Sequence, residues 1–200
     1  MYTAIILAAG EADRMGKLKQ LLPWQDKTIL ETVIDNVLAS EHIDDEVRVV
    51  LGAEAERVKN KIDYYDDPRF RIKENPDYSR GMSSSLRVGV RNLSKNTKSL
   101  VIFLGDQPLI TPDIFDNIII EFEKSSSEIM MPIYNEKPGH PVIISTKYLD
   151  EIEKLEGPMG LKPFIEDHKD LVNYYPIEEE KVTIDLDYYD DYIYYKNKYN

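Results

Sequence analysis

The chain has 200 residues, of which 42% are hydrophobic, enough for one sizeable core, and we expect a single domain over residues 1–200. It carries 25 basic and 37 acidic residues, and the net charge of −12 disfavours a broad surface for nucleic acid or an anionic membrane. There is no cysteine, which excludes disulfides, thiolate metal sites and cysteine nucleophiles, so any metal must be held by oxygen or imidazole.

The first apolar segment, Ala4–Ala9, is expected to be a buried strand. It does not resemble a signal peptide, because it lacks a basic leader and charged residues begin at Glu11. No stretch of the sequence reaches the ~20 apolar residues that a membrane-spanning helix needs. We therefore expect a soluble, cytoplasmic protein.

After this segment, short apolar runs alternate with segments whose apolar residues recur every three or four positions. The runs expected to be strands are Val47–Leu51, Leu100–Leu104, Ile129–Ile133 and Pro141–Ser145. The expected helices are Ile29–Leu38, with Thr28 as its N-cap, Glu54–Ile62, Ser83–Leu93, Pro112–Lys124, Tyr148–Leu155 and Gly160–His168. This alternation predicts an α/β fold with a mainly parallel sheet, whose ligand site lies beyond the carboxyl ends of the strands.

The C-terminal segment Asp185–Asn200 is unusually rich in Tyr, Asp and Lys. We expect it to form a last helix that packs its aromatic side chains against the domain. A disordered tail is the alternative, because chain termini often fray unless contacts hold them.

The loop after the first strand, residues 7–19, combines small residues with cations. The cations are Arg14, Lys17 and Lys19. Small residues let backbone N–H groups approach a ligand closely, and the cations suit a triphosphate. The loop matches neither G-x-x-x-x-G-K-[ST] nor G-x-G-x-x-G, because Gly10 and Gly16 are six apart and no Lys-Ser/Thr follows. The alternative is a flexible turn with solvated charges.

A second loop leads into the helix expected from Ser83. Three consecutive serines, Ser83 to Ser85, follow Gly81 and Met82. Serines at a helix N-terminus offer hydroxyls and amides to a polar or anionic group. A run of serines that faces solvent is the alternative.

The apolar run Leu100–Leu104 ends in Gly105-Asp106. A carboxylate at the ligand-binding edge of a sheet suits Mg²⁺, which typically binds one or two carboxylates together with substrate phosphates. Asp106 is therefore the leading candidate metal ligand. The alternative is a Gly-Asp turn whose side chain bonds only the backbone.

Two weaker clusters lie nearer the C-terminus. His140 stands between Gly139 and Pro141, where a histidine is more often structural than catalytic, although it could donate to a phosphate. Asp185 and Asp187 follow a short β-like run and could supply a second metal carboxylate.

Taken together, these segments resemble the molybdenum cofactor cytidylyltransferase family, within the MobA-like NTP transferase superfamily. The resemblance runs in chain order over almost the whole sequence. The matching motifs are Leu7-Ala8-Ala9-Gly10, Arg14-Met15-Gly16 with Lys19, Asn75-Pro76, Gly81-Met82-Ser83-Ser84-Ser85, Leu104-Gly105-Asp106-Gln107-Pro108, Gly139-His140-Pro141-Val142 and Asp185-Leu186-Asp187.

The resemblance implies a three-layer α/β/α sandwich of the Rossmann-related, GT-A-like nucleotidyltransferase kind. It also implies a Mg²⁺-dependent reaction in which CTP and molybdopterin give the cytosine dinucleotide form of the cofactor and pyrophosphate. A molybdoenzyme that receives the product is the implied partner.

The resemblance further implies roles for individual residues. Arg14 and Lys19 would grip the triphosphate and, with Asp106, carry catalysis. The nucleotide-binding set would be Leu7, Ala8, Ala9, Gly10, Arg14, Lys19, Asn75, Gly81, Met82, Ser83 and Ser84.

Mg²⁺ would be bound by Asp106 with Asp187 or Asp185, and Gly139 and His140 would face the acceptor. Two positions depart from the family pattern. Ala12 stands where serine is common, and Tyr188-Tyr189 stand where Thr-Pro is usual.

Alternatives remain within and beyond the enzyme class. One is a guanylyltransferase of the same pathway, although Ala8-Ala9-Gly10 resembles the cytidylyl branch and a Gly-Gly form is usual in the guanylyl branch. Another is a transferase acting on a different phosphorylated acceptor. A nucleotide-binding module without turnover is a third, disfavoured because a pure scaffold needs none of the charged residues Arg14, Lys19 and Asp106.

Overall fold

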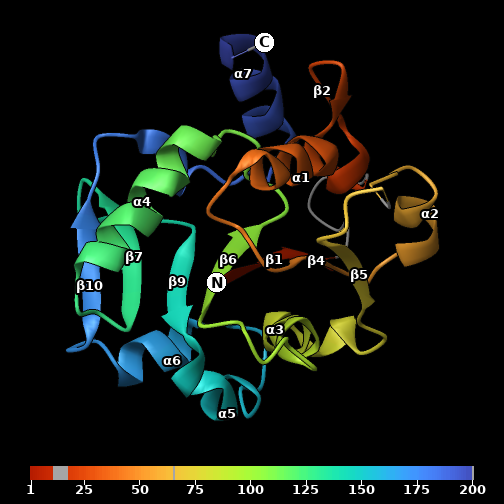
Figure 1. Ribbon diagram of the computed structural model, residues 1–200. Coiled ribbons are helices and arrows are strands. Elements are labelled where there is room, and N and C mark those ends of the chain that lie inside the picture. The colour runs from red at the N-terminus through yellow and green to blue at the C-terminus, as the bar shows by residue number, and fades with distance from the viewer. Residues whose placement is uncertain (11–17, 65, 200) are drawn as a thin grey trace.

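A computed structural model describes residues 1–10, 18–64 and 66–199. Its centre is a sheet of eight strands with helices on both faces (Figure 1). The strands of this sheet are β1 (Tyr2–Ala8), β4 (Val47–Leu51), β5 (Phe70–Glu74), β6 (Ser99–Leu104), β7 (Ile129–Tyr134), β8 (Lys137–Pro138), β9 (Val142–Ser145) and β10 (Val172–Pro176). A separate hairpin joins β2 (Pro23–Trp24) to β3 (Lys27–Thr28).

Helices cover the sheet in two layers (Figure 1). The α-helices are α1 (Ile29–Ala39), α2 (Ala55–Lys59), α3 (Met82–Val90), α4 (Pro112–Lys124), α5 (Leu149–Ile152), α6 (Lys162–Asp167) and α7 (Tyr189–Tyr199). Short 3-10 turns are η1 (Lys19–Leu21), η2 (Tyr78–Arg80), η3 (Thr146–Tyr148) and η4 (Glu180–Thr183). The apolar sides of α1 and α4 form one core with the sheet, and those of α3, α5 and α6 form the other. The expected three-layer α/β/α fold is confirmed.

The strand order β10-β7-β9-β6-β1-β4-β5 places β1 near the middle of the sheet. Strands β6, β1, β4 and β5 run parallel, and β9 is antiparallel to both β6 and β7. Within β1, Ala4, Ile5 and Ile6 are fully buried because helices cover both faces. The carboxyl ends of β1 and β6 meet at one edge, since Leu7 pairs with Leu104.

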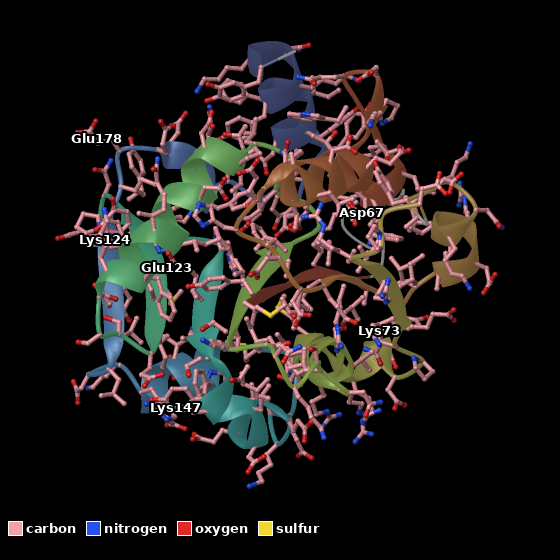
Figure 2. The ribbon with its side chains drawn as sticks, viewed as in Figure 1. Asp67, Lys73, Glu123, Lys124, Lys147 and Glu178 are labelled. Carbon is pink, nitrogen blue, oxygen red and sulfur yellow. The ribbon has the colours of Figure 1, made fainter. Side chains whose placement is uncertain are left out.

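Helix α1 begins and ends with specific polar contacts. The Thr28 hydroxyl accepts from the Glu31 backbone N–H, and the Glu31 carboxylate accepts from the Thr28 N–H, which confirms the expected N-cap as a full capping box. At and beyond the last turn of α1, the guanidinium of Arg69 donates to the carbonyls of Leu38, Ser40 and Ile43. Asp67, in the stretch between α2 and β5 (Figure 2), holds the Arg69 guanidinium in place at 2.9 Å.

Several elements differ from the expectation. The edge strands β5 and β10 were not predicted, because half-exposed strands such as Phe-Arg-Ile-Lys-Glu lack a continuous apolar run. The β-like run expected before Asp185 is wrong, since η4 occupies that segment. Thr111 is the N-cap residue of α4, but its side chain makes no capping bond within the described part of the chain.

The C-terminal segment forms the expected helix, α7. Tyr192 is its buried residue, and its ring packs against Trp24 of the hairpin. The Tyr192 hydroxyl donates to the carbonyl of Pro23 at 2.7 Å. Contacts of this kind fix the helix to the domain. Among the helices of residues 1–10, 18–64 and 66–199, none is both long and apolar enough to span a membrane.

Candidate active site

A pocket of about 360 Å³ lies where the carboxyl ends of β1 and β6 meet the start of α3. Open α/β sheets place their ligand sites at this edge. The walls come from the β1 loop, the start of α3, the end of β6 and the C-terminal aspartates. The lining residues used below are Leu7, Ala8, Ala9, Gly10, Lys19, Gln20, Gly81, Met82, Ser85, Asp106, Asp185 and Asp187.

The backbone at the end of β1, from Ala8 to Gly10, is held by a buried glutamine. Gln20 is 2% exposed, and its Nε2 donates to the carbonyls of Ala8 at 3.0 Å and Gly10 at 3.2 Å. These bonds fix the backbone of residues 8–10 where it lines the pocket. Sequence reasoning missed Gln20, because a buried polar side chain is recognisable only from the groups it contacts.

Two carboxylates share one ammonium group in the pocket. Lys19 Nζ donates to Asp106 Oδ2 and, at 2.9 Å, to Asp187 Oδ1. Burial alone would lower the pKa of Lys19, but Asp106 and Asp187 outweigh it and raise this pKa. Lys19 is therefore a charged group that neutralises part of a concentrated negative charge.

The second oxygen of Asp106 is buried and has no hydrogen-bond partner among the described residues. An unpaired buried carboxylate oxygen costs free energy and calls for an explanation such as a cation. Asp106 and Asp187 both contact Lys19, so the two carboxylates are close enough to share a cation. No cluster of three or more His, Cys, Asp or Glu side chains arranged to hold a metal occurs in the described ranges. The pair suits Mg²⁺, which uses one or two carboxylates and completes its shell with phosphates and water.

Asp185 lies beside this pair. It accepts from Gln107 Nε2 at 2.6 Å, and Gln107, 3% exposed, was not predicted from the sequence. Although Asp185 is open to the pocket, the protein atoms crowded around it and then the charge of Asp106 raise its pKa to about 6. Asp185 thus ionises less readily than an ordinary aspartate.

The serine run at the start of α3 turns its hydroxyls into the protein. Ser83 Oγ donates to the carbonyls of Glu156 and Gly160, each at 3.2 Å. Ser84 Oγ donates to the carbonyl of Gly81 at 2.7 Å. Of the three serines, Ser85 lines the pocket.

Asn75 fastens the preceding loop to the same helix. Its Nδ2 donates to Ser84 Oγ at 2.8 Å and to Ser85 Oγ at 3.0 Å. Asn75 and Ser84 line a neighbouring cavity beside β5. Gly81 has φ +99°, and a Cβ at this position would lie 2.4 Å from the Pro158 Cα, so only glycine fits this turn.

Gly139 and His140 support the segment that carries the C-terminal aspartates. The His140 N–H donates to the Val182 carbonyl at 2.9 Å, and a Cβ on Gly139 would lie 2.4 Å from the same oxygen. Burial lowers the pKa of His140 to about 4, against the opposing charge of Asp106, so the ring is neutral near pH 7. In the described part of the chain, neither residue lines the pocket.

The structure therefore brings together at one pocket Leu7, Ala8, Ala9, Gly10, Lys19, Gly81, Met82, Asp106, Asp185 and Asp187. The start of α3, next to this pocket, is held by Asn75, Ser83 and Ser84. The segment that carries the C-terminal aspartates is contacted by Gly139 and His140. Arg14, like Ala12, lies outside the described residues.

Three relatives cover between 76% and 98% of the chain. The molybdenum cofactor cytidylyltransferase of Escherichia coli (strain K12) is 29% identical over 98% of this chain and 95% of its own length. A probable molybdenum cofactor guanylyltransferase of Methanosarcina mazei is 30% identical over 76% of this chain and 67% of its own. A nicotine blue oxidoreductase of Paenarthrobacter nicotinovorans is 28% identical, with 92% and 91% covered.

Solved structures share the fold and, in one case, hold a metal. A Mycobacterium tuberculosis H37Rv protein, Rv0371C, in complex with manganese, is 28% identical, with a TM-score of 0.80 over 98% of this chain and 97% of that one. The family model described as the MobA-like NTP transferase domain matches residues 4–172. That match contains the β1 loop, the start of α3 and Asp106, which together form most of the pocket. The chain belongs to the MobA-like NTP transferase family and is a nucleotidyltransferase of that family.

Proposed function

We propose that this nucleotidyltransferase moves CMP from CTP to molybdopterin and releases pyrophosphate, with Mg²⁺ as its metal. The observation that carries this proposal is the trio of Lys19, Asp106 and Asp187 at the carboxyl ends of β1 and β6. The near full-length similarity to the Escherichia coli cytidylyltransferase supports CTP and molybdopterin as the substrates.

Asp106 and Asp187 would hold the metal, with Asp185 as the alternative to Asp187 for the second carboxylate. The unpaired buried oxygen of Asp106 supports this assignment. When bound, Mg²⁺ would neutralise charge on the phosphates of the nucleotide. The manganese complex of the Mycobacterium tuberculosis relative supports a divalent cation in this fold.

Lys19 would exchange partners when substrate binds. In the free protein its ammonium is held by Asp106 and Asp187. A divalent cation on those carboxylates would release Lys19 toward the triphosphate, where we also place Arg14. Both side chains would then stabilise the charge that develops on the α-phosphate and the departing pyrophosphate.

The transfer itself needs positioning more than covalent help. An oxygen of the acceptor phosphate attacks the α-phosphorus of CTP, and the bond from that phosphorus to the β-phosphate bridging oxygen breaks. The leaving group is pyrophosphate. A phosphate monoester is largely ionised near neutral pH, so no protein base has to remove a proton from the attacking oxygen.

The remaining predicted residues take supporting roles in this proposal. Backbone from Leu7 to Gly10, together with Gly81 and Met82, would hold the base and ribose, and Asn75, Ser83 and Ser84 would fix the helix start behind them. Gly139 and His140 would act on the acceptor through the segment they support. We also propose that a molybdoenzyme receives the product.

The test is pyrophosphate release with each of the four NTPs, Mg²⁺ and purified molybdopterin, with Asp106→Asn as the blank. Release with CTP alone is expected. Release with GTP instead would replace the proposal with guanylyl transfer, which the similarity to the Methanosarcina mazei protein makes the second candidate. No pyrophosphate release with any of the four NTPs would contradict both candidate functions. Attention would then turn to other activities, because one relative of this chain carries the name of an oxidoreductase.

A further inference from the structure

We propose that a second pocket, walled by α7, binds the planar heterocycle of the acceptor. This inference rests on the proposed transfer reaction and extends it to the acceptor. The pocket measures about 350 Å³, and we call it the tyrosine pocket. Its wall includes Tyr134, Tyr188, Tyr195 and Asp191, together with Asp185 and Asp187.

The position of the tyrosine pocket fits an acceptor. Asp185 and Asp187 line both this pocket and the one at the ends of β1 and β6. In an in-line transfer the attacking oxygen and the leaving group lie on opposite sides of the phosphorus. The acceptor must therefore arrive from a space that adjoins the carboxylates but lies apart from the nucleotide, as the tyrosine pocket does.

The chemistry of the wall selects the class of acceptor. Tyr134, Tyr188 and Tyr195 line the pocket, and stacking on aromatic rings is a main source of affinity for flat ligands. Asp191 could accept hydrogen bonds from N–H donors on the edge of the heterocycle. Hydrogen bonds to a charged carboxylate are stronger than those between neutral groups. A pterin with amino and ring N–H groups meets both requirements.

A cation lies where the phosphate arm of the acceptor would pass. Lys137 lines the tyrosine pocket, and its Nζ donates to the Thr183 carbonyl at 2.9 Å. Asp185 and Asp187 line the same pocket as Lys137. An anionic arm that reaches the shared aspartates would therefore meet a positive charge beside them.

The wall is fixed to the protein rather than free to collapse. Glu180 accepts from Lys198 at 2.8 Å and from the Tyr199 hydroxyl at 3.0 Å, which ties the end of α7 to the segment before the aspartates. Buried Tyr192 anchors the same helix to the hairpin. Tyr188, by contrast, is 56% exposed, so its ring can be removed without disturbing a core.

The experiment measures binding of 6-hydroxymethylpterin, a fluorescent pterin, to the full chain by fluorescence titration. Tyr188→Ala and Asp191→Asn are the test variants. Tyr174→Ala, an exposed tyrosine of β10, and Asp190→Asn, the neighbouring acid of α7, are the matched controls because neither lines the tyrosine pocket as described.

We expect about tenfold weaker pterin binding in both test variants and less than about a twofold change in both controls. CTP affinity should be unchanged in all four variants. Equal pterin binding by test and control variants would overturn the proposal, as would no binding by the wild-type chain.

A second readout separates this inference from the proposed reaction. If pyrophosphate release proceeds and Tyr188→Ala leaves the KM for molybdopterin unchanged, the tyrosine pocket is wrong and the transfer stands. If pterin binding depends on Tyr188 but no NTP supports release, the pocket stands and the transfer is wrong.

Discussion

Two charged clusters of this chain differ in how completely their polar atoms are paired. The guanidinium of Arg69 donates to Asp67 and to backbone carbonyls that end α1. The other cluster, which we call the Lys19 cluster, consists of Lys19, Asp106, Asp185, Asp187 and Gln107. In it, buried oxygens of Asp106 and Gln107 have no partner among the described residues. The first cluster stabilises the fold, and the second keeps binding capacity for a ligand. Unpaired buried polar atoms are rare enough to mark such a site.

The largest expected effect comes from removing the Asp106 carboxylate of the Lys19 cluster. Asp106→Asn keeps the shape of the side chain but weakens its hold on a cation, and we expect turnover to fall by about a thousandfold or more. The thermal unfolding temperature should stay close to that of the wild type, because the amide keeps an oxygen that can accept from Lys19, and Asp187 still pairs with the Lys19 ammonium. Retention of Mg²⁺-dependent pyrophosphate release would contradict the metal assignment.

Lys19 offers the second test, because it should act oppositely on two ligands. Lys19→Met should lower the use of CTP by about a hundredfold, since a cation for the triphosphate is lost. It should strengthen Mn²⁺ binding to the nucleotide-free protein by about tenfold, because Asp106 and Asp187 then lack their shared ammonium.

Electron paramagnetic resonance of free Mn²⁺ measures this binding directly. Lys27→Met is the matched control, since Lys27 pairs with Asp35 on the surface and away from the pocket. Unchanged Mn²⁺ affinity in Lys19→Met would show that the ammonium does not compete with the metal.

The smallest expected effect concerns the cluster of Arg69 and Asp67. Arg69 lowers the pKa of Asp67 in the folded protein. The Asp67–Arg69 pair therefore stabilises the fold above the unfolded pKa of about 3.9, and this stabilisation is lost as the pH falls through the lower folded pKa. Asp67→Asn should therefore cost about 1 kcal/mol of unfolding free energy at pH 7. The difference from the wild type should begin to narrow near about pH 4 and close as the pH falls through the lowered folded pKa of Asp67.

Urea unfolding at several pH values checks this prediction, with Asp66→Asn as the control on the neighbouring exposed acid. Catalytic turnover should be unaffected by either change. A loss of stability that does not vary with pH would mean that the Asp67 carboxylate charge is not what holds Arg69.

The sequence predicts the middle of the fold better than its margins. Strands β1, β4 and β6 are buried on both faces, so each is mainly apolar, apart from Arg48 in β4, and can be recognised without its neighbours. Strands β5 and β10 lie at the edges. Strand β5 mixes charged with apolar residues, and β10 mixes an asparagine and tyrosines with apolar ones. Their assignment depends on pairing with β4 and β7, which no local pattern expresses.

The candidate site divides in the same way. Lys19 and Asp106 follow from motifs, because each stands at a fixed place after a strand. Gln20 and Gln107 do not, since their roles depend on contacts with Ala8 and with Asp185, across 12 and 78 positions of sequence. The serines were expected to face a ligand, but Ser83 donates to the carbonyls of Glu156 and Gly160, and Ser84 donates to that of Gly81. Of the three, Ser85 lines the pocket.

The most direct test of the central claim follows the phosphorus atom itself. The chain is incubated with Mg²⁺, molybdopterin and CTP that carries a radiolabel at the α-phosphate. The account predicts that label moves to molybdopterin in equal amount with the pyrophosphate released, and that Asp106→Asn abolishes both. Label found only in CTP or in free CMP would contradict transfer at the Lys19 cluster.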